Sequence, residues 1–268
     1  MAKPIGIFDS GLGGLTVARA IAGALPAENL VYLGDTARVP YGTRSAKTVV
    51  KYAIGCAKRL LSCDIKLLVV ACNTASGVAL GDLQDRLDIP VIGVIQPGAR
   101  AGVRATRSGR IGILATAGTV ASGAYERAIH GENKAMNVFA LSAPLLVPLA
   151  EEGWVTGEVP RLAARRYLQP LVDVDVDTIV LGCTHYPLLS KTIREVAAEL
   201  LGHEVAIVDS AEATAATLAK MLGLDTNDEG PAGSLEILVT DLPAQFGAAA
   251  ARFLGKPVEG LDIRAIDL

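Results

Sequence analysis

Two of the four cysteines, Cys72 and Cys183, stand in similar positions of similar segments. Cys72 ends an aliphatic run and is followed by Asn-Thr, and Cys183 ends a second aliphatic run and is followed by Thr-His. A thiol can act as an acid, a base or a nucleophile, because its pKa lies near neutrality and responds to neighbouring charges. The repeated pattern therefore predicts a chemical function for this pair of thiols.

Other interpretations of the cysteines are conceivable. A lone cysteine is most often a small buried hydrophobe, which suits Cys56 and Cys63. Cys183 could be the nucleophile of a Cys-His hydrolase with His185, but Cys72 would then have no role. A metal site is not expected, because the chain has three histidines and neither a Cys-x-x-Cys nor a His-Glu-x-x-His sequence.

The matched pair is best explained by two acid/base groups that face one another across a cleft. Each thiol would belong to its own half of the chain. One of them could remove a proton from one face of a carbon atom while the other returns a proton to the opposite face.

A glycine-rich segment, Asp9-Ser10-Gly11-Leu12-Gly13-Gly14, opens the chain's first helical pattern. It does not fit a dinucleotide fingerprint, because a Gly-x-Gly-x-x-Gly that starts at Gly11 would need glycine at Thr16. Two interpretations stay open. Its backbone N–H groups could bind a carboxylate at the helix start, or it could be a plain tight turn in which Asp9 caps the helix.

Two further segments are rich in polar residues. The segment 34–42, Gly-Asp-Thr-Ala-Arg-Val-Pro-Tyr-Gly, follows a predicted strand and is either part of a site or an ordinary surface loop. Glu151 and Glu152 precede the single tryptophan and are either functional or solvated charges. We expect His130 and His203 to be surface or satisfied histidines.

The elements that would carry these residues alternate along the chain, which is typical of parallel α/β structure. β-rich runs are found at 5–8, 30–32, 67–71, 91–94, 110–114, 137–140, 178–181, 205–208 and 235–239. Helical spacing of apolar residues is found at 14–24, 45–62, 75–87, 121–130, 156–170, 188–201, 211–221 and 242–254, and Asp241 is expected to start the last helix. In such sheets ligands bind at the carboxyl ends of the strands, where both cysteines, Asp9-Ser10 and Thr116 are placed.

Internal similarity predicts two related halves. The run 66–74 resembles 177–185, and 4–11 resembles 109–116. Pro97 and Gly98 after the strand at 91–94 indicate a boundary there. We expect one α/β domain formed by 1–97 with 209–268 and a second formed by 98–208.

Composition excludes several classes of protein. The 268 residues hold 25 basic and 28 acidic side chains, a net charge of −3, so nucleic acid is not expected as the main substrate. Every apolar stretch is interrupted before the ~18 residues that a membrane span needs. The first residues, Met1 to Ile5, contain no signal-type segment, and the cysteines are too few for a disulfide framework. We therefore expect a cytoplasmic protein without membrane association.

Eight motifs together resemble the glutamate racemase family, the cofactor-independent branch of the aspartate/glutamate racemase superfamily. The resemblance runs from Ile5 to about Ala213. The motifs are FDSGLGG at 8–14, GDTARVPYG at 34–42, ACNTAS at 71–76, GVIQPG at 93–98, ATAGTV at 115–120, EEGW at 151–154, LGCTHYPL at 181–188 and VDSA at 208–211.

The resemblance implies an α/β fold with two pseudo-symmetric three-layer domains, mostly parallel sheets and an active site in the cleft between them. It also implies interconversion of L-glutamate and D-glutamate for peptidoglycan precursors, without cofactor or metal. Cys183 would deprotonate L-glutamate and Cys72 would serve D-glutamate. Asp9, near Cys72, and His185, near Cys183, would assist together with Glu151.

The family positions that hold the substrate's ammonium and carboxylate groups would be Asp9, Ser10, Tyr41, Gly42, Asn73, Thr74, Thr184 and His185, with Thr116 and Thr119 as further candidates. A homodimer is expected by analogy. Three alternatives remain: an aspartate racemase, a Cys-His hydrolase and a binding protein without catalysis. The Pro40-Tyr41-Gly42 loop favours glutamate over aspartate as the substrate.

Overall fold

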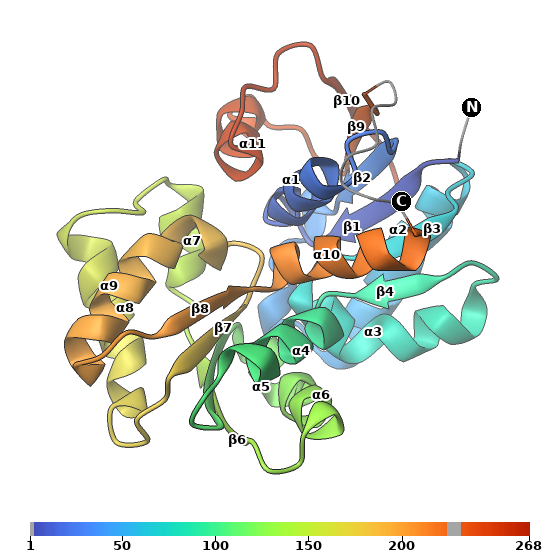
Figure 1. The fold of residues 1–268 in the computed structure, drawn as a ribbon. Coiled ribbons are helices and arrows are strands. Elements are labelled where there is room, and N and C mark those ends of the chain that lie inside the picture. Colours follow the sequence, from blue (N-terminus) through green and yellow to red (C-terminus); the bar gives the residue numbers. More distant parts are fainter. Residues whose placement is uncertain (1–2, 224–231) are drawn as a thin grey trace.

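Two parallel β-sheets organise the chain in a computed structural model that describes residues 3–223 and 232–268 (Figure 1). The six-stranded sheet has the order β10-β9-β2-β1-β3-β4 and the four-stranded sheet the order β6-β5-β7-β8. The strands are β1 (Ile5–Asp9), β2 (Leu30–Gly34), β3 (Leu67–Val70), β4 (Val91–Gly93), β5 (Arg110–Ala115), β6 (Asn137–Ser142), β7 (Thr178–Gly182), β8 (Ala206–Asp209), β9 (Leu235–Val239) and β10 (Asp262–Ala265). Neighbouring strands are parallel throughout both sheets.

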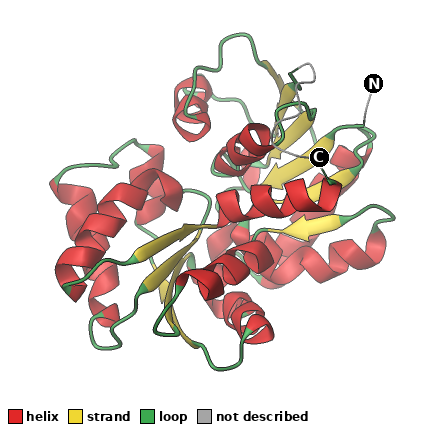
Figure 2. Ribbon diagram, in the orientation of Figure 1, coloured by secondary structure: helices red, strands yellow, loops and turns green. Residues whose placement is uncertain are grey.

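Helices cover both faces of the sheets (Figure 2). They are α1 (Leu15–Ala24), α2 (Ala46–Leu61), α3 (Asn73–Arg86), α4 (Ile95–Ala105), α5 (Ala117–Ser122), α6 (Ala124–Glu132), α7 (Leu146–Glu151), α8 (Glu158–Leu168), α9 (Ser190–Leu201), α10 (Ser210–Leu222) and α11 (Phe246–Leu254). Side-chain caps start several of them. Asp209, for example, accepts a 2.7 Å hydrogen bond from the Ala211 N–H at the start of α10.

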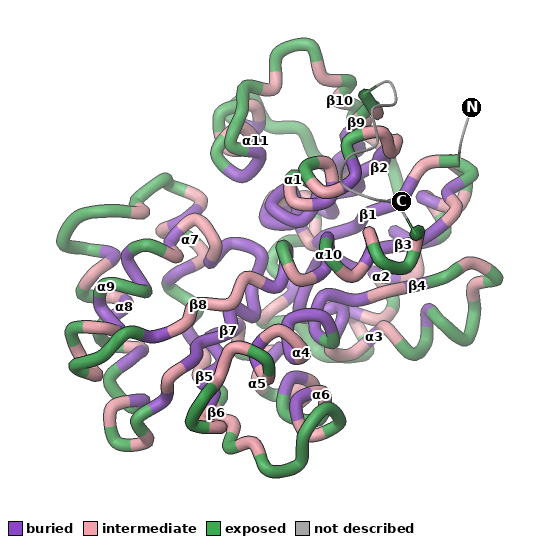
Figure 3. Tube along the Cα trace, viewed as in Figure 1, coloured by how far each residue is buried: buried purple, intermediate pink, exposed green. Residues whose placement is uncertain are grey.

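Alternation along the strands explains this layering, because successive side chains of a strand point to opposite faces. In β1, Ile5 and Ile7 belong to the apolar cluster that includes α1 and α10, whereas Phe8 belongs to the cluster with α2 and α3. In β7, Ile179 and Leu181 pack in the first of these clusters, and Val180 packs with α4 and α6. Both faces are therefore buried, and the central strands are buried along their length (Figure 3).

The expected α/β fold with parallel sheets is confirmed, but several elements were predicted wrongly. The turn at Gln96-Pro97-Gly98 lies inside α4, which tolerates proline because Pro97 is in its first turn. The helix expected at 121–130 is divided by Gly123, whose φ is +61°. Helix α11 starts at Phe246, and Asp241 does not begin it.

Other elements carried no clear signal. Helix α7 is six residues long and begins without a side-chain cap, and strand β10 is mostly exposed, so neither shows a strong periodic pattern. Within residues 3–223 and 232–268, no helix combines the length and hydrophobicity that crossing a bilayer requires. Met1 and Ala2, used above to argue against a signal segment, lie outside the described residues.

Candidate active site

The carboxyl ends of strands from both sheets surround one cavity of about 190 Å³. Its volume is below the ~300–1,000 Å³ of pockets for drug-sized ligands, so it suits a small metabolite. The six-stranded sheet contributes residues that follow β1, β2 and β3, and the four-stranded sheet contributes residues that follow β5, β6 and β7. The lining residues are Ser10, Val39, Pro40, Tyr41, Gly42, Thr43, Cys72, Asn73, Thr74, Thr116, Ala117, Pro144, Val147, Pro148, Cys183, Thr184 and His185.

Cys72 lies between β3 and α3 at one side of this cavity and is 5% exposed. Its Sγ lies 3.5 Å from the Ser10 Oγ, to which it can donate. Burial, followed by the negative charge of Asp9, raises the pKa of Cys72 to about 12, although the Ala75 N–H and Ser10 oppose this shift. At neutral pH Cys72 is therefore a protonated thiol.

Asp9 lies beneath Cys72 at the end of β1 and is fully buried. Its Oδ2 accepts a 3.1 Å hydrogen bond from the Gly11 N–H, and its Oδ1 has no hydrogen-bond partner among the described residues. Burial raises the pKa of Asp9, while His185 and nearby backbone N–H groups lower it. The side chain does not cap α1, in contrast to the tight-turn interpretation.

Cys183 follows β7 on the other side and is 6% exposed. The His185 Nδ1 lies 3.8 Å from its Sγ, and the His185 Nε2 lies 3.0 Å from the Glu151 Oε1. Burial lowers the pKa of His185, but the hydrogen bonds to Cys183 and Glu151 outweigh it and raise this pKa to about 10. His185 is therefore protonated at neutral pH, and its ring forms a T-shaped contact with the Phe253 ring, with centroids 5.0 Å apart.

The glycine-rich segment brings the two halves together. A Cβ atom on Gly13 would lie 2.2 Å from the Thr184 Oγ1 and 2.4 Å from the His185 Nδ1. Thr16, at the start of α1, donates a 3.0 Å hydrogen bond to the Thr184 carbonyl. The absence of a side chain at Gly13 thus permits the backbone before α1 to approach the Cys183 side of the cavity.

Hydroxyl groups line the cavity between the two cysteines. The Oγ1 atoms of Thr74, Thr116 and Thr119 lie 2.9 to 3.2 Å from one another. Thr74 and Thr116 line the cavity and come from different halves, whereas Thr119 is buried behind them. Such groups can donate to a carboxylate or accept from an ammonium group.

The structure brings most of the sequence-predicted residues to the cavity wall and places three behind it. Asp9, Thr119 and Glu151 do not line the cavity, and each contacts or neighbours a residue that does. The predicted residues on the wall are Ser10, Tyr41, Gly42, Cys72, Asn73, Thr74, Thr116, Cys183, Thr184 and His185.

Some residues around the site were not predicted. Asp35, fully buried, accepts hydrogen bonds from the Arg38 Nε, the Tyr41 hydroxyl and the Thr240 hydroxyl, and so holds the loop that carries Tyr41. The position of Asp35 in the polar segment 34–42 was the signal in the sequence that could have identified it. Apolar lining residues such as Pro144 and Val147 gave no such signal, because apolar side chains are also typical of an ordinary hydrophobic core.

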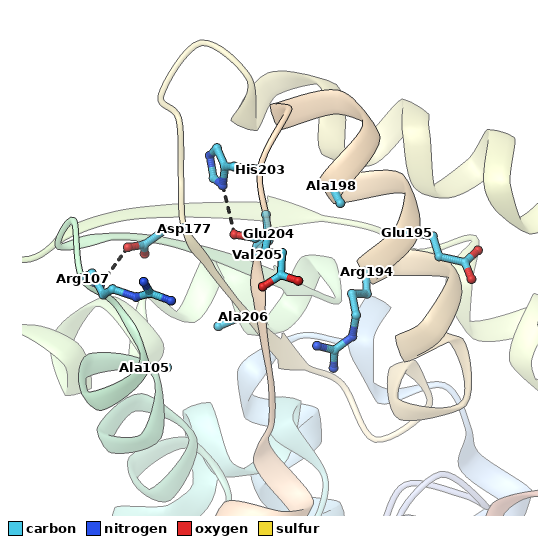
Figure 4. Close-up of a pocket in the computed structure, with 10 residues that line it drawn as sticks. All are labelled: Ala105, Arg107, Asp177, Arg194, Glu195, Ala198, His203, Glu204, Val205 and Ala206. Carbon is cyan, nitrogen blue, oxygen red and sulfur yellow. Dashed lines mark hydrogen bonds between the residues drawn. The ribbon is translucent and has the colours of Figure 1, made fainter.

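A larger cavity of about 680 Å³ lies at the opposite, amino-terminal edge of the four-stranded sheet (Figure 4). It is lined by charged residues of both signs, including Arg107, Asp177 and Arg194. Burial opposes ionisation of Asp177, but hydrogen bonds from Thr106, Ser108 and Arg107 lower its pKa to about 2. Asp177 therefore stabilises the turn before β5, and neither Cys72 nor Cys183 lines this cavity.

Comparison with known proteins agrees with this site. The family described as Asp/Glu/Hydantoin racemase matches residues 8–218. A glutamate racemase of Geobacter metallireducens is 53% identical over 255 residues, which cover 94% of this chain and 93% of the relative. The chain belongs to the glutamate racemase family.

Solved structures of this family have the same fold. A glutamate racemase isoform of Bacillus anthracis, RacE1, superimposes with a TM-score of 0.88 at 38% identity, covering 99% of this chain and 98% of that one. A glutamate racemase of Francisella tularensis, solved in complex with D-glutamate, gives a TM-score of 0.87 at 34% identity, with 99% and 97% covered. The similarity thus extends over both sheets.

Proposed function

We propose that the protein is a glutamate racemase that interconverts L-glutamate and D-glutamate by direct proton transfer between the substrate and two thiols. The observation that carries this proposal is the placement of Cys72 and Cys183, on separate halves, in the wall of one small cavity. Membership of the glutamate racemase family supports the substrate. The D-glutamate produced would supply peptidoglycan synthesis.

The two thiols differ in their surroundings in the way a two-base reaction requires. Protonated His185 beside Cys183 stabilises a thiolate there, whereas burial and Asp9 keep Cys72 protonated. From this state the Cys183 thiolate takes the α-proton of L-glutamate, and the Cys72 thiol donates its proton to the opposite face. The products are D-glutamate, a Cys183 thiol and a Cys72 thiolate, which is the state that reacts with D-glutamate.

Removal of an α-proton leaves negative charge on the α-carbon and its carboxylate, so the site must stabilise that charge. Preorganised donors in a water-excluded cavity do this most effectively. Asn73, Thr74 and Thr184 follow the two cysteines in sequence and line the cavity, and Ser10, also in the cavity wall, lies 3.5 Å from the Cys72 Sγ. We assign them, with Tyr41, Gly42 and Thr116, to holding the ammonium and carboxylate groups, and we assign Thr119, behind the wall, to supporting Thr74 and Thr116.

Asp9, His185 and Glu151 are proposed to act through the thiols. His185 contacts Cys183 directly, and Glu151 holds His185 protonated from outside the cavity. Asp9 lies beneath Cys72, where its charge opposes premature ionisation of the thiol. When Cys72 becomes a thiolate, proton uptake by Asp9 or charge from His185 would balance it.

We further propose two domains, one formed by 1–97 with 209–268 and the other by 98–208. The strands of the six-stranded sheet all belong to the first range and those of the four-stranded sheet, apart from the last residue of β8, to the second. Both cysteines are nearly inaccessible, so relative movement of the domains would admit the substrate. Limited opening should therefore be detectable as alkylation of Cys183, the thiol beside His185, that L-glutamate suppresses.

A homodimer in the cytoplasm is the proposed state of the enzyme. Leu145, Trp154, Val159 and Leu162, on and beside α7 and α8, are each about half exposed or more, and such apolar residues favour contact with a second copy. All four cysteines are free, and a reducing compartment would keep the two functional thiols active. Sedimentation of the wild type and of Leu162→Glu would test the dimer, and a monomeric wild type would contradict it.

The test of the proposed function is a rate comparison among amino acids. The purified enzyme should racemise L- and D-glutamate, as measured by chiral chromatography, and should act on aspartate far more slowly. Faster turnover of aspartate would identify an aspartate racemase. Binding of glutamate without racemisation would indicate a non-catalytic binding protein, and an acyl group trapped on Cys183 would indicate a hydrolase.

A further inference from the structure

The side-chain amide of Asn73 is hydrogen-bonded at its oxygen atom but has no partner among the described residues at its nitrogen atom. Asn73 lines the central cavity and is 3% exposed. Its Oδ1 accepts a 2.7 Å hydrogen bond from the Tyr125 hydroxyl, whereas its Nδ2 is buried without a partner among the described residues. Buried polar groups are normally hydrogen-bonded, so an unpartnered N–H₂ group in a cavity wall indicates a missing acceptor.

Tyr125 comes from the other half of the molecule. It is on α6, is 3% exposed and packs among the apolar side chains between α4, α6 and the four-stranded sheet. It does not line the cavity. Burial raises the pKa of Tyr125 well above its usual value, so its hydroxyl is a donor at every pH at which the enzyme would work.

Two glycines make room for this tyrosine. A Cβ atom on Gly98 would lie 3.3 Å from the Tyr125 hydroxyl oxygen and 3.1 Å from the Ser210 Cβ. A Cβ atom on Gly182 would lie 2.9 Å from the Tyr125 Cε2. Both glycines belong to motifs singled out in the sequence and neither lines the cavity, and contact with Tyr125 is one reason why a side chain would not fit at either position.

We propose that Tyr125 is a positioning residue that orients the Asn73 amide so that its N–H₂ group faces a carboxylate of the substrate. Because the hydroxyl holds Oδ1, the amide cannot rotate to present its oxygen to a negatively charged group. The inference rests on the proposed function, which supplies the carboxylate. It also links the two halves, since a residue of one half fixes a substrate contact in the other.

The decisive variant is Tyr125→Phe, which removes only the hydroxyl oxygen. The KM for both glutamate enantiomers should rise about tenfold, a change of about 1.4 kcal/mol, while kcat changes less than about threefold. This split is expected because the substrate carboxylate is already an anion in the ground state, so most of the strength of the contact is present before the transition state. A purely structural role for Tyr125 would lower thermal stability without raising KM.

A double-mutant cycle makes the test specific. In an Asn73→Ala background, Tyr125→Phe should have no further effect on KM, because the amide it orients is gone. Thr192→Val is the control: it removes a buried hydroxyl that donates to the Val155 carbonyl from α9, a helix without cavity-lining residues, and should leave KM unchanged. Additive effects in the cycle, or a wild-type KM in Tyr125→Phe, would overturn the proposal.

Gly98→Ala is a second variant should Tyr125→Phe fold poorly. Alanine is compatible with the α4 helix, and its methyl group would crowd both the Ser210 Cβ and the Tyr125 hydroxyl. A shift of that hydroxyl by a few tenths of an ångström should again raise KM with kcat little changed. An unchanged KM in this variant would contradict the proposal. The wild type is assayed alongside, and its failure to racemise glutamate would refute the proposed function rather than the role of Tyr125.

Discussion

The Nδ1 atom of His185 lies 3.8 Å from the Sγ atom of Cys183, whereas Cys72 has Ser10 as its side-chain partner and the buried Asp9 beneath it. The two thiols of one cavity therefore lie in opposite electrostatic surroundings. In the proposed reaction, this asymmetry would allow one of two chemically identical groups to be the base while the other is the acid.

Substitution of either thiol in the cavity should stop racemisation. Cys72→Ser and Cys183→Ser should each lower kcat by a factor of at least about 10²–10⁴, because a serine hydroxyl is too weak an acid or base to replace the thiol. Cys63→Ser is the matched control, since Cys63 is partly exposed near the end of α2 and its side chain hydrogen-bonds to Arg59. Coupled chiral assays at saturating glutamate measure the effect. Substantial turnover by the Cys72 variant would refute the two-thiol reaction.

Glu151→Gln should change the pH dependence of the reaction of L-glutamate. In the wild type, His185 has a raised pKa of about 10, so its positive charge beside Cys183 persists as pH rises until that value is approached. Without the Glu151 charge the pKa of His185 falls, and the alkaline loss of kcat/KM should begin at lower pH. Profiles of kcat/KM between pH 6 and 10 would show this, and superimposable profiles would contradict the role of Glu151.

Gly13→Ala should damage the site although Gly13 carries no functional group. Its methyl group would meet the Thr184 hydroxyl and the His185 ring, so these groups must move and kcat should fall by about 10²-fold, as expected for a misplacement of about 1 Å. Gly23→Ala, within α1, meets nothing within 4 Å and should be neutral or stabilising by up to about 1 kcal/mol. Equal activities of the two variants would show that the close approach at Gly13 is unimportant.

Asp35→Asn should loosen the loop that carries Tyr41 and Gly42. Asparagine cannot accept all the hydrogen bonds that Arg38, Tyr41 and Thr240 donate to the buried carboxylate. We expect the free energy of unfolding to fall by about 2 kcal/mol. This is less than the ~3–5 kcal/mol expected when a wholly buried ion pair is broken, because Arg38 is partly exposed. Thermal denaturation should show a Tm lower by about 4–8 °C, and a kinetic assay should show a higher KM for glutamate.

The control for that loss is Asp64→Asn, which breaks an exposed ion pair with Lys3. Such a pair contributes about 0–1 kcal/mol, so Tm should hardly change. If Asp35→Asn were no more destabilising than this control, the buried network would not stabilise the loop.

The sequence predicted what local patterns encode and missed what tertiary packing decides. The aliphatic runs before Cys72 and Cys183 identified β3 and β7, and their polar continuations identified one wall of the site. Helix α4 was missed because Pro97 and Gly98 read as a turn, although proline is tolerated in a first helical turn. Tyr125 was missed because a single tyrosine in a helix gives no sign that its hydroxyl reaches a residue of the other half.

The origin of the proton in newly formed D-glutamate tests the central claim most directly. The wild-type enzyme is given protiated L-glutamate in D₂O, and the Cα isotope of both enantiomers is followed by mass spectrometry and NMR at low conversion. The account predicts one deuterium at Cα in the D-glutamate formed, because Cys72 has exchanged with solvent, while the remaining L-glutamate keeps its protium. D-Glutamate that retains the original protium, or L-glutamate that gains deuterium as fast as product forms, would show that one base serves both faces and would contradict the two-thiol account.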